Sequence, residues 1–244
     1  GYYAQVEREI LQELGYDFKM VILEAPDSRI SELLLQLKAL GEKVSVREAY
    51  KAIRFAWKKL VAIEKLEKKL EYSLPRALDK NRMETLFERA LQAIDEAESP
   101  QEVEKIAQES LREMEKSPCK SAEVLKIGLV GEIYTILEPA SNCHVARCLG
   151  RLDAQVSRSI YVSDWVNDHL FGGYLRKSNH KQIMQSSRPY LNYEVGGHGR
   201  ETVGSTVDFA RRDYNGIIQI APLTCMPEIV AQSILGKVSE ELEI

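Results

Sequence analysis

The C-terminal half of the sequence alternates short apolar runs with helical patterns, and this alternation limits the folds open to the chain. Three runs have the composition of strands: residues 126–130 (KIGLV), 155–162 and 216–222 (GIIQIAP). Helical spacing lies between them, from Asn142 to Leu149 before Gly150, and follows at residues 227–238. Strands joined through helices pair in parallel sheets. We therefore expect an α/β lobe over residues 121–244.

The first 45 residues carry a shorter version of the same pattern. Apolar residues at helical spacing end at Gly15, a run at residues 19–23 (KMVIL) reads as a strand, and Ile30–Leu40 reads as a second helix. This pattern begins without a first strand, and the later lobe stops where another strand would follow. We therefore expect residues 1–45 to be the remnant of a first α/β lobe and the second lobe to lack its last strand.

Residues 46–120 have a different character. Three apolar stripes lie at helical spacing, with lysine and glutamate on the remaining faces, and they end at Pro75, near Pro100 and at Pro118, respectively. No strand pattern lies between them. We predict an all-helical insert between the two lobes, with its charged residues on a solvated surface.

The composition excludes several classes of protein. A net charge of -4 over 244 residues argues against a nucleic-acid-binding protein, which needs a basic face. The longest apolar runs fall far short of the ~20 residues that cross a bilayer, and the first residues include Glu7 and Glu9 where a signal peptide would be apolar. We expect a cytoplasmic protein that binds neither membranes nor nucleic acids.

Four cysteines in a chain of this length do not form a disulfide framework. Cys225 directly follows a strand and begins a helix, where ligands of open α/β sheets bind, so it is either a metal ligand or nucleophile or a small buried residue. Cys143 and Cys148 are five residues apart, and residues at that spacing do not share a helix face, so we interpret both as inert. Cys119 is expected to be an exposed thiol.

The segment from Gly196 to Glu201 (GGHGRE) is the most glycine-dense part of the chain and precedes a predicted helix at residues 202–211. The backbone amides of Gly196, Gly197 and Gly199 are candidates to hold an anion such as a CoA phosphate, with His198 close to the ligand. The spacing does not match a dinucleotide fingerprint or a P-loop. The alternative, to which we give equal weight, is that the segment is a surface loop in which glycines are needed for positive φ angles.

Polar side chains follow two other strands. Glu132, after the strand at residues 126–130, is a candidate general base or a helix cap. Asp164 and Trp165 follow the strand at residues 155–162. One interpretation is that their side chains line the same cleft as Glu132, and the other is that Trp165 closes the hydrophobic core.

Four segments in one order carry a resemblance: IGLVGEIYTILEP, YVSDWVNDHL, VGGHGRETVG and PLTCMPEIVAQSIL. They resemble CoA protein activases, which are relatives of 2-hydroxyacyl-CoA dehydratase components and of the C-terminal regions of large CoA-substrate-specific enzyme activases. The resemblance implies Rossmann-like lobes and an iron–sulfur (4Fe–4S) cluster held by strand-end cysteines, of which Cys225 matches the last. Its other ligands belong to segments that precede this chain in the relatives, so the cluster is expected in the intact protein and not in this fragment.

The resemblance implies an anaerobic protein acting in low-potential electron transfer, or in reductive or dehydration chemistry on CoA thioesters. Glu132 and His198 are then the catalytic candidates, and an acyl-CoA is the expected small-molecule partner. The alternative is a non-catalytic subunit that binds an activating ATPase or a dehydratase through the helical insert.

Overall fold

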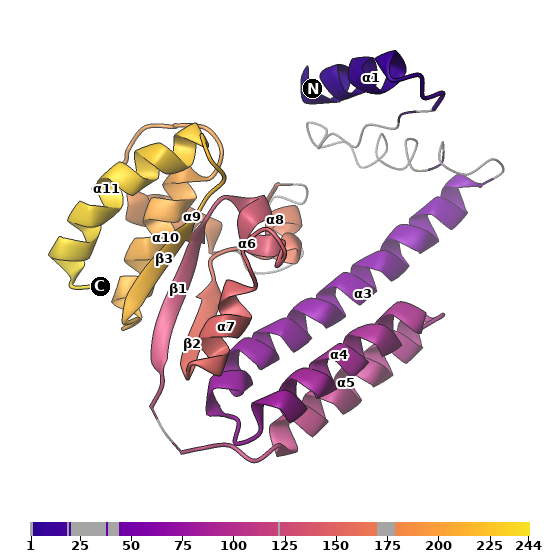
Figure 1. Cartoon of the computed structure of the whole chain (residues 1–244), viewed down its shortest axis with the longest axis horizontal. Helices are drawn as coiled ribbons and strands as arrows, with labels where there is room; N and C mark the ends of the chain where they lie inside the picture. Colours follow the sequence, from indigo (N-terminus) through magenta and orange to yellow (C-terminus); the bar gives the residue numbers. More distant parts are fainter. Residues whose placement is uncertain (1, 19, 21–37, 39–43, 122, 170–178) are drawn as a thin grey trace.

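The computed structural model describes residues 2–18, 20, 38, 44–121, 123–169 and 179–244 (Figure 1). Helix α1 (Tyr2–Glu13) confirms the first predicted helix, and Gly15 follows it with a φ of 82°. The predicted strand at residues 19–23 and the predicted helix Ile30–Leu40 lie almost entirely outside the described residues.

Three long helices occupy the predicted helical insert. They are α3 (Val46–Ser73), α4 (Lys80–Glu96) and α5 (Pro100–Lys116), with a 3₁₀ turn η1 (Leu74–Arg76) between the first two. Ser45 and Glu48 form a capping box at the start of α3, and Ser99 caps α5 with Pro100 in its first turn. The predicted helices and the break at Pro75 are confirmed.

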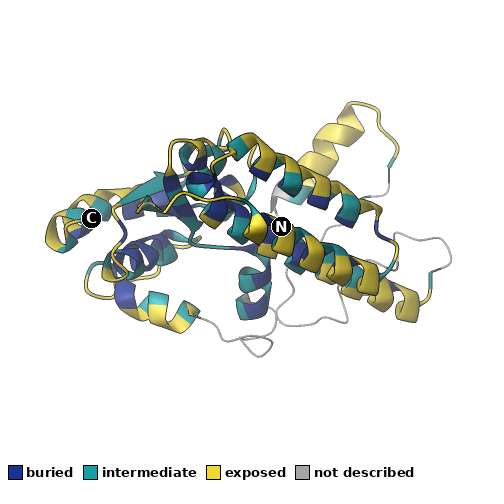
Figure 2. Cartoon of the chain, turned by 90° about the horizontal axis from the view of Figure 1, so that it is seen from below, coloured by how far each residue is buried: buried dark blue, intermediate teal, exposed yellow. Residues whose placement is uncertain are grey.

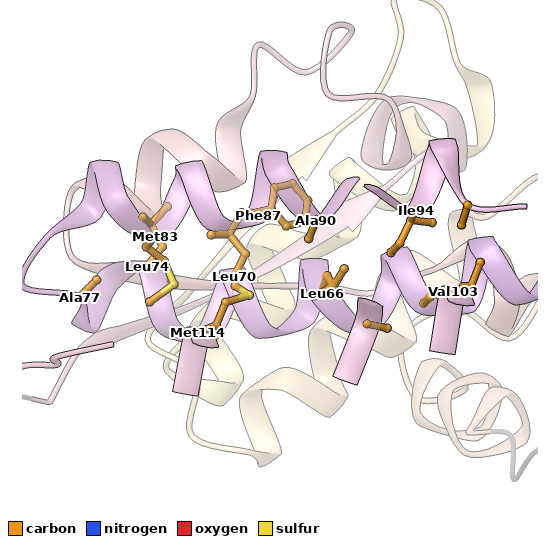
Figure 3. Close-up of a cluster of buried hydrophobic side chains, with 13 residues drawn as sticks. Leu66, Leu70, Leu74, Ala77, Met83, Phe87, Ala90, Ile94, Val103 and Met114 are labelled. Carbon is orange, nitrogen blue, oxygen red and sulfur yellow. The ribbon is translucent and has the colours of Figure 1, made fainter. Parts of the chain in front are cut away.

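The inner faces of these helices form one apolar core. Leu66, Met83 and Ile94 are fully buried and meet Val103 and Met114 across the three helices (Figure 3). The outer faces are exposed (Figure 2), as expected for amphipathic helices. Lysines and glutamates of the three helices lie mainly on those outer faces.

A parallel sheet follows, with strands β1 (Leu125–Gly131), β2 (Ala154–Arg158) and β3 (Gly216–Ile220) in the order β2-β1-β3. The α/β class and the parallel pairing are confirmed. The predicted strand over residues 155–162 is too long, because helix α8 (Val162–His169) already begins at its last residue. The Glu64 carboxylate on α3 accepts hydrogen bonds from the amide and hydroxyl of Ser163, which stabilises that helix start.

Helices cover both faces of the sheet. Leu129 packs with Ile136 beside α6 (Ile133–Leu137) and α7 (Val145–Arg151) on one face. Val130 points the other way and packs with Phe209 of α10 (Gly199–Arg211). Helices α9 (His180–Ser187) and α11 (Met226–Leu242) pack on α10 in turn (Figure 1). Alternate residues of β1 thus serve two cores.

Gly150 does not end α7 as predicted but lies inside it. A Cβ atom at Gly150 would lie 2.8 Å from Cδ2 of Leu74, so a larger residue would displace the Leu74 side chain where α7 packs against η1. Within the described part of the chain, no helix has the length and apolar character needed to cross a bilayer.

Candidate functional site

Three helices begin close together at the carboxyl ends of β1 and β3. Helix α6 follows Glu132, α10 follows His198 and α11 follows Cys225. The Glu132 amide donates a hydrogen bond to the carbonyl of Ile220 at 3.0 Å, which joins the start of α6 to the end of β3. Ligands of open α/β sheets bind at this edge, and helix N-termini give it a positive potential. This edge is the candidate functional site.

Glu132 is the cap of α6. Its Oε2 accepts a hydrogen bond from the Thr135 amide at 3.0 Å, so the capping alternative describes the geometry. Gly131 before it has a φ of 135°, and a Cβ atom there would lie 1.9 Å from the carbonyl oxygen of Ile220. Only glycine permits this close approach of β1 to the end of β3. The role of Glu132 as a general base stays a prediction.

The glycine-rich segment packs against the start of α11. Gly196 and Gly197 have φ values of 75° and 48°, as the surface-loop interpretation requires. At Gly199 a Cβ atom would lie 2.5 Å from the carbonyl oxygen of Pro227. Two segments that are far apart in the sequence therefore lie in contact, and His198 stands at their junction, half-buried at the start of α10.

Glu228, which is not among the residues predicted from the sequence, joins α10, β3 and α11 beside this junction. Its carboxylate accepts hydrogen bonds from Thr202 Oγ1 of α10 at 2.9 Å and from Gln219 Nε2 of β3 at 2.8 Å. Its side chain is 2% exposed. Burial raises the pKa of Glu228, while the hydrogen bonds from Gln219 and Thr202 and the nearby His198 oppose the rise. The CMPE pattern, an acid in the first turn of a helix, is the sequence signal that points to it.

Cys225 is the N-cap residue of α11 and is half-buried. Its side chain makes no capping hydrogen bond to the helix. Thr224 before it has a φ of 69°, a left-handed conformation that non-glycine residues adopt at a cost of ~1–3 kcal/mol and that is frequent at functional sites. Cys225 stands at the start of a helix as predicted, but the predicted strand at residues 216–222 is too long, because β3 ends at Ile220 and residues 221–224 separate it from Cys225.

The described residues do not form a complete iron–sulfur site. All four cysteines are described and unpaired, and Cys119, Cys143 and Cys148 are exposed. No three histidine, cysteine, aspartate or glutamate side chains of the described ranges are grouped so that they could hold a metal ion. A cubane cluster takes about four thiolates or their equivalents. Among the four cysteines, Cys225 is the one that is not exposed and that begins a helix on the carboxyl side of the sheet.

A second feature missed from the sequence is a buried charged cluster where α3 meets the end of β2. The Arg158 side chain is 6% exposed, with Nη2 2.6 Å from a Glu67 oxygen and Nε 2.8 Å from a Glu71 oxygen. The Tyr161 hydroxyl donates a hydrogen bond to Glu71 at 2.6 Å. Lys68 Nζ lies 3.7 Å from the centre of the Tyr161 ring. This cluster joins the helical insert to the sheet.

The charges of this cluster set its pKa values. Burial alone lowers the pKa of Arg158, but the carboxylates of Glu71 and Glu67 raise it by more, so the guanidinium stays charged. Burial raises the pKa of Glu71, and Arg158 and Tyr161 only partly oppose this. Burial and the neighbouring Glu71 raise the pKa of Tyr161, which stays protonated as a donor.

A cavity of about 420 Å³ lies beside the cluster, between β2 and helices α8, α9 and α10. Trp165, Asp164 and His198 line it, whereas Glu132, with which this segment was predicted to share a cleft, is not among the lining residues. This volume is in the range of small-molecule sites. The cavity therefore extends the candidate site along the carboxyl edge of the sheet.

Comparison of the chain with protein-family models, with curated proteins and with solved structures gave no match.

Proposed function

We propose that this chain is a lobe of a cytoplasmic iron–sulfur protein related to 2-hydroxyacyl-CoA dehydratase components. The observation that carries the proposal is the setting of Cys225, which occupies the N-cap position of α11 in the segment that follows β3 and is preceded by a left-handed threonine. The four sequence segments that resemble CoA protein activases add to it, and three of them lie along this edge. In this proposal the lobe is Rossmann-like.

The chain contributes one thiolate in this proposal. The peptide dipoles of α11 favour a negative charge at its first turn, where the Cys225 thiol lies. Glu228 fixes that turn to α10 and β3 through Thr202 and Gln219. The remaining ligands come from outside the described residues. The system as a whole then performs low-potential electron transfer, or reductive or dehydration chemistry, on a CoA thioester.

The test is the iron and acid-labile sulfide content of the full-length protein purified and reconstituted without oxygen. We expect iron in the wild type and a sharp loss in Cys225→Ala. Cys119→Ala is the matched control, because Cys119 is exposed and lies at the end of the helical insert, away from Cys225. Its backbone pairs there with Ala77 in an isolated bridge. Iron that is absent, or that is equally retained in Cys225→Ala, rejects the cluster proposal.

The alternative function is a partner-binding subunit, and the surface of α3 favours it. Arg47, Lys51, Arg54 and Lys58 recur at intervals of about one helical turn on the exposed side of α3. Tyr50 lies among them and is 50% exposed, with the Arg54 guanidinium 5.9 Å from its ring centre. A basic stripe with an exposed aromatic residue suits an acidic surface of an activating ATPase or a dehydratase subunit.

This alternative is tested by pull-down with the activating ATPase. We expect Lys51→Glu combined with Arg54→Glu to abolish capture. Lys116→Glu should leave capture of the ATPase unchanged, because Lys116 is the last residue of α5 and does not belong to the basic stripe of α3. Equal capture by both variants rejects α3 as the docking surface.

Acyl-CoA binding at the glycine-rich segment remains a proposal. Gly196 and Gly197 are exposed and precede the 13-residue helix α10, but Arg200 is engaged by Glu194 and lies against the Met184 carbonyl. Calorimetric titration with an acyl-CoA should release heat that is lost in a variant with residues 196–197 replaced by alanine. No heat in the wild type rejects the site.

A further inference from the structure

Cys143 and Cys148 flank the start of α7. Their spacing of five residues predicts different faces of one helix, but α7 begins at Val145 with His144 as its N-cap residue, so Cys143 lies outside the helix. Cys143 therefore stands just before the N-cap and Cys148 is the fourth helical residue. These are the two positions that a hydrophobic staple joins across a helix start.

The backbone brings the two cysteines together. The Cys148 thiol donates a hydrogen bond to the carbonyl oxygen of Cys143, with an S···O distance of 3.7 Å. Cys143 and His144 both have a φ of 54°, and this left-handed pair folds the chain tightly before α7. The fold is held by the His144 amide, which donates to the Pro139 carbonyl at 2.8 Å, and by Asn142 Oδ1, which accepts from the Val145 amide at 3.3 Å.

Both thiols are open to small reagents. Cys143, His144 and Cys148 are exposed. Disulfide formation requires Cα atoms about 4.4–6.8 Å apart. The contact of Cys148 Sγ with the main-chain oxygen of Cys143 places the two residues next to each other. An accessible, nearby pair of thiols is the arrangement of a reversible redox site, and in reducing compartments such disulfides are transient or act as sensors.

We propose that Cys143 and Cys148 form a reversible dithiol–disulfide site that reacts with low-molecular-weight disulfides such as glutathione disulfide. One thiolate attacks the reagent, forms a mixed disulfide and releases a glutathione thiolate. The second thiolate attacks the protein sulfur of that mixed disulfide and releases the second glutathione. The two cysteines lose two protons and two electrons, and the electrons reduce one glutathione disulfide to two glutathiones. This site is independent of Cys225 and of the proposed cluster.

The test is mass spectrometry of the whole chain after incubation with glutathione disulfide, followed by peptide mapping. We expect the peptide mapping to show a bond between Cys143 and Cys148, with a mass about 2 Da below that of the reduced peptide, that dithiothreitol reverses. In Cys143→Ser and in Cys148→Ser the second step cannot occur, so each variant should retain one glutathione on its remaining cysteine of the pair. Cys119→Ser is the matched control and should form the internal disulfide as the wild type does.

A second probe tests proximity without oxidation. Phenylarsine oxide binds pairs of neighbouring thiols, and we expect one equivalent on the wild type and on Cys119→Ser but none on Cys148→Ser. A wild-type chain that accumulates stable glutathione adducts on both cysteines, or that forms disulfides only between chains, overturns the proposal. Failure of the cluster experiment with Cys225→Ala leaves this result unaffected, because the two readouts concern different cysteines.

Discussion

Replacement of Arg158 by methionine should destabilise the protein strongly. Arg158 is the cation of a buried cluster with Glu67 and Glu71, and methionine has a similar length without charge. Removing one partner of a buried ion pair leaves an uncompensated charge and costs ~3–5 kcal/mol. The loss falls on the junction between α3 and β2, which the cluster joins.

The assay is urea unfolding followed by circular dichroism. With a dependence on urea of ~3 kcal/mol per molar for a chain of this size, a loss of ~4 kcal/mol lowers the midpoint by ~1.3 M. The double variant Arg158→Met, Glu71→Leu removes the more deeply buried of the two carboxylates that Arg158 pairs with and should recover part of the loss, because Glu67 still lacks its cation.

A loss below ~1 kcal/mol in Arg158→Met would refute this reasoning, since such values are typical of solvated surface pairs. A double variant no more stable than the single one would also contradict it. That result would show that the loss comes from packing of the Arg158 side chain and not from the unpaired carboxylates.

Three further predictions use other parts of the fold. Gly199→Ala should lower the free energy of unfolding in urea by ~1–3 kcal/mol, because its Cβ atom would lie 2.5 Å from a backbone oxygen of α11. The control Gly236→Ala places its Cβ atom within 4 Å of no heavy atom beyond its chain neighbours and its own helix backbone, and it should raise that free energy by ~1 kcal/mol, because alanine favours a helix over glycine. The pKa of Glu228 is raised above its ordinary value of 4.5 in the folded state, so its contribution to stability is present at low pH and is lost as the pH rises through the raised value. Thermal unfolding of Glu228→Gln between pH 4 and 8 should show less loss with rising pH than the wild type, and parallel curves would contradict the assignment. Leu66→Ala, at a fully buried position, should lower the free energy of unfolding by ~2–5 kcal/mol. Leu78 is 63% exposed, so Leu78→Ala should change it by less than ~0.5 kcal/mol. Equal losses for the two variants in calorimetry would be inconsistent with the core described.

The helices and strands follow largely from local pattern. The stripes of α3, α4 and α5 and the breaks at Pro75 and Pro100 depend on neighbours within one or two turns, so the sequence contains the information that places them. The strand-to-helix position of Cys225 is equally local. The sequence predicts a strand that continues past β2, because residues 159–162 are apolar enough for one. The start of α8 is stabilised by a hydrogen bond from the Ser163 amide to Glu64, which lies 99 positions away in the sequence.

The candidate site depends on contacts that no local pattern contains. Glu71 and Tyr161 are 90 positions apart, and Thr202 and Glu228 are 26 apart. These side chains are buried and paired only in the folded protein, so their pKa values depend on tertiary contacts. The need for glycine at Gly199 likewise comes from its contact with the backbone of Pro227. The sequence by itself determined the helical insert, the parallel strands and the place of Cys225. Tertiary structure decided which charges are desolvated together, because electrostatic energy depends on distance and solvent exposure and not on position along the chain.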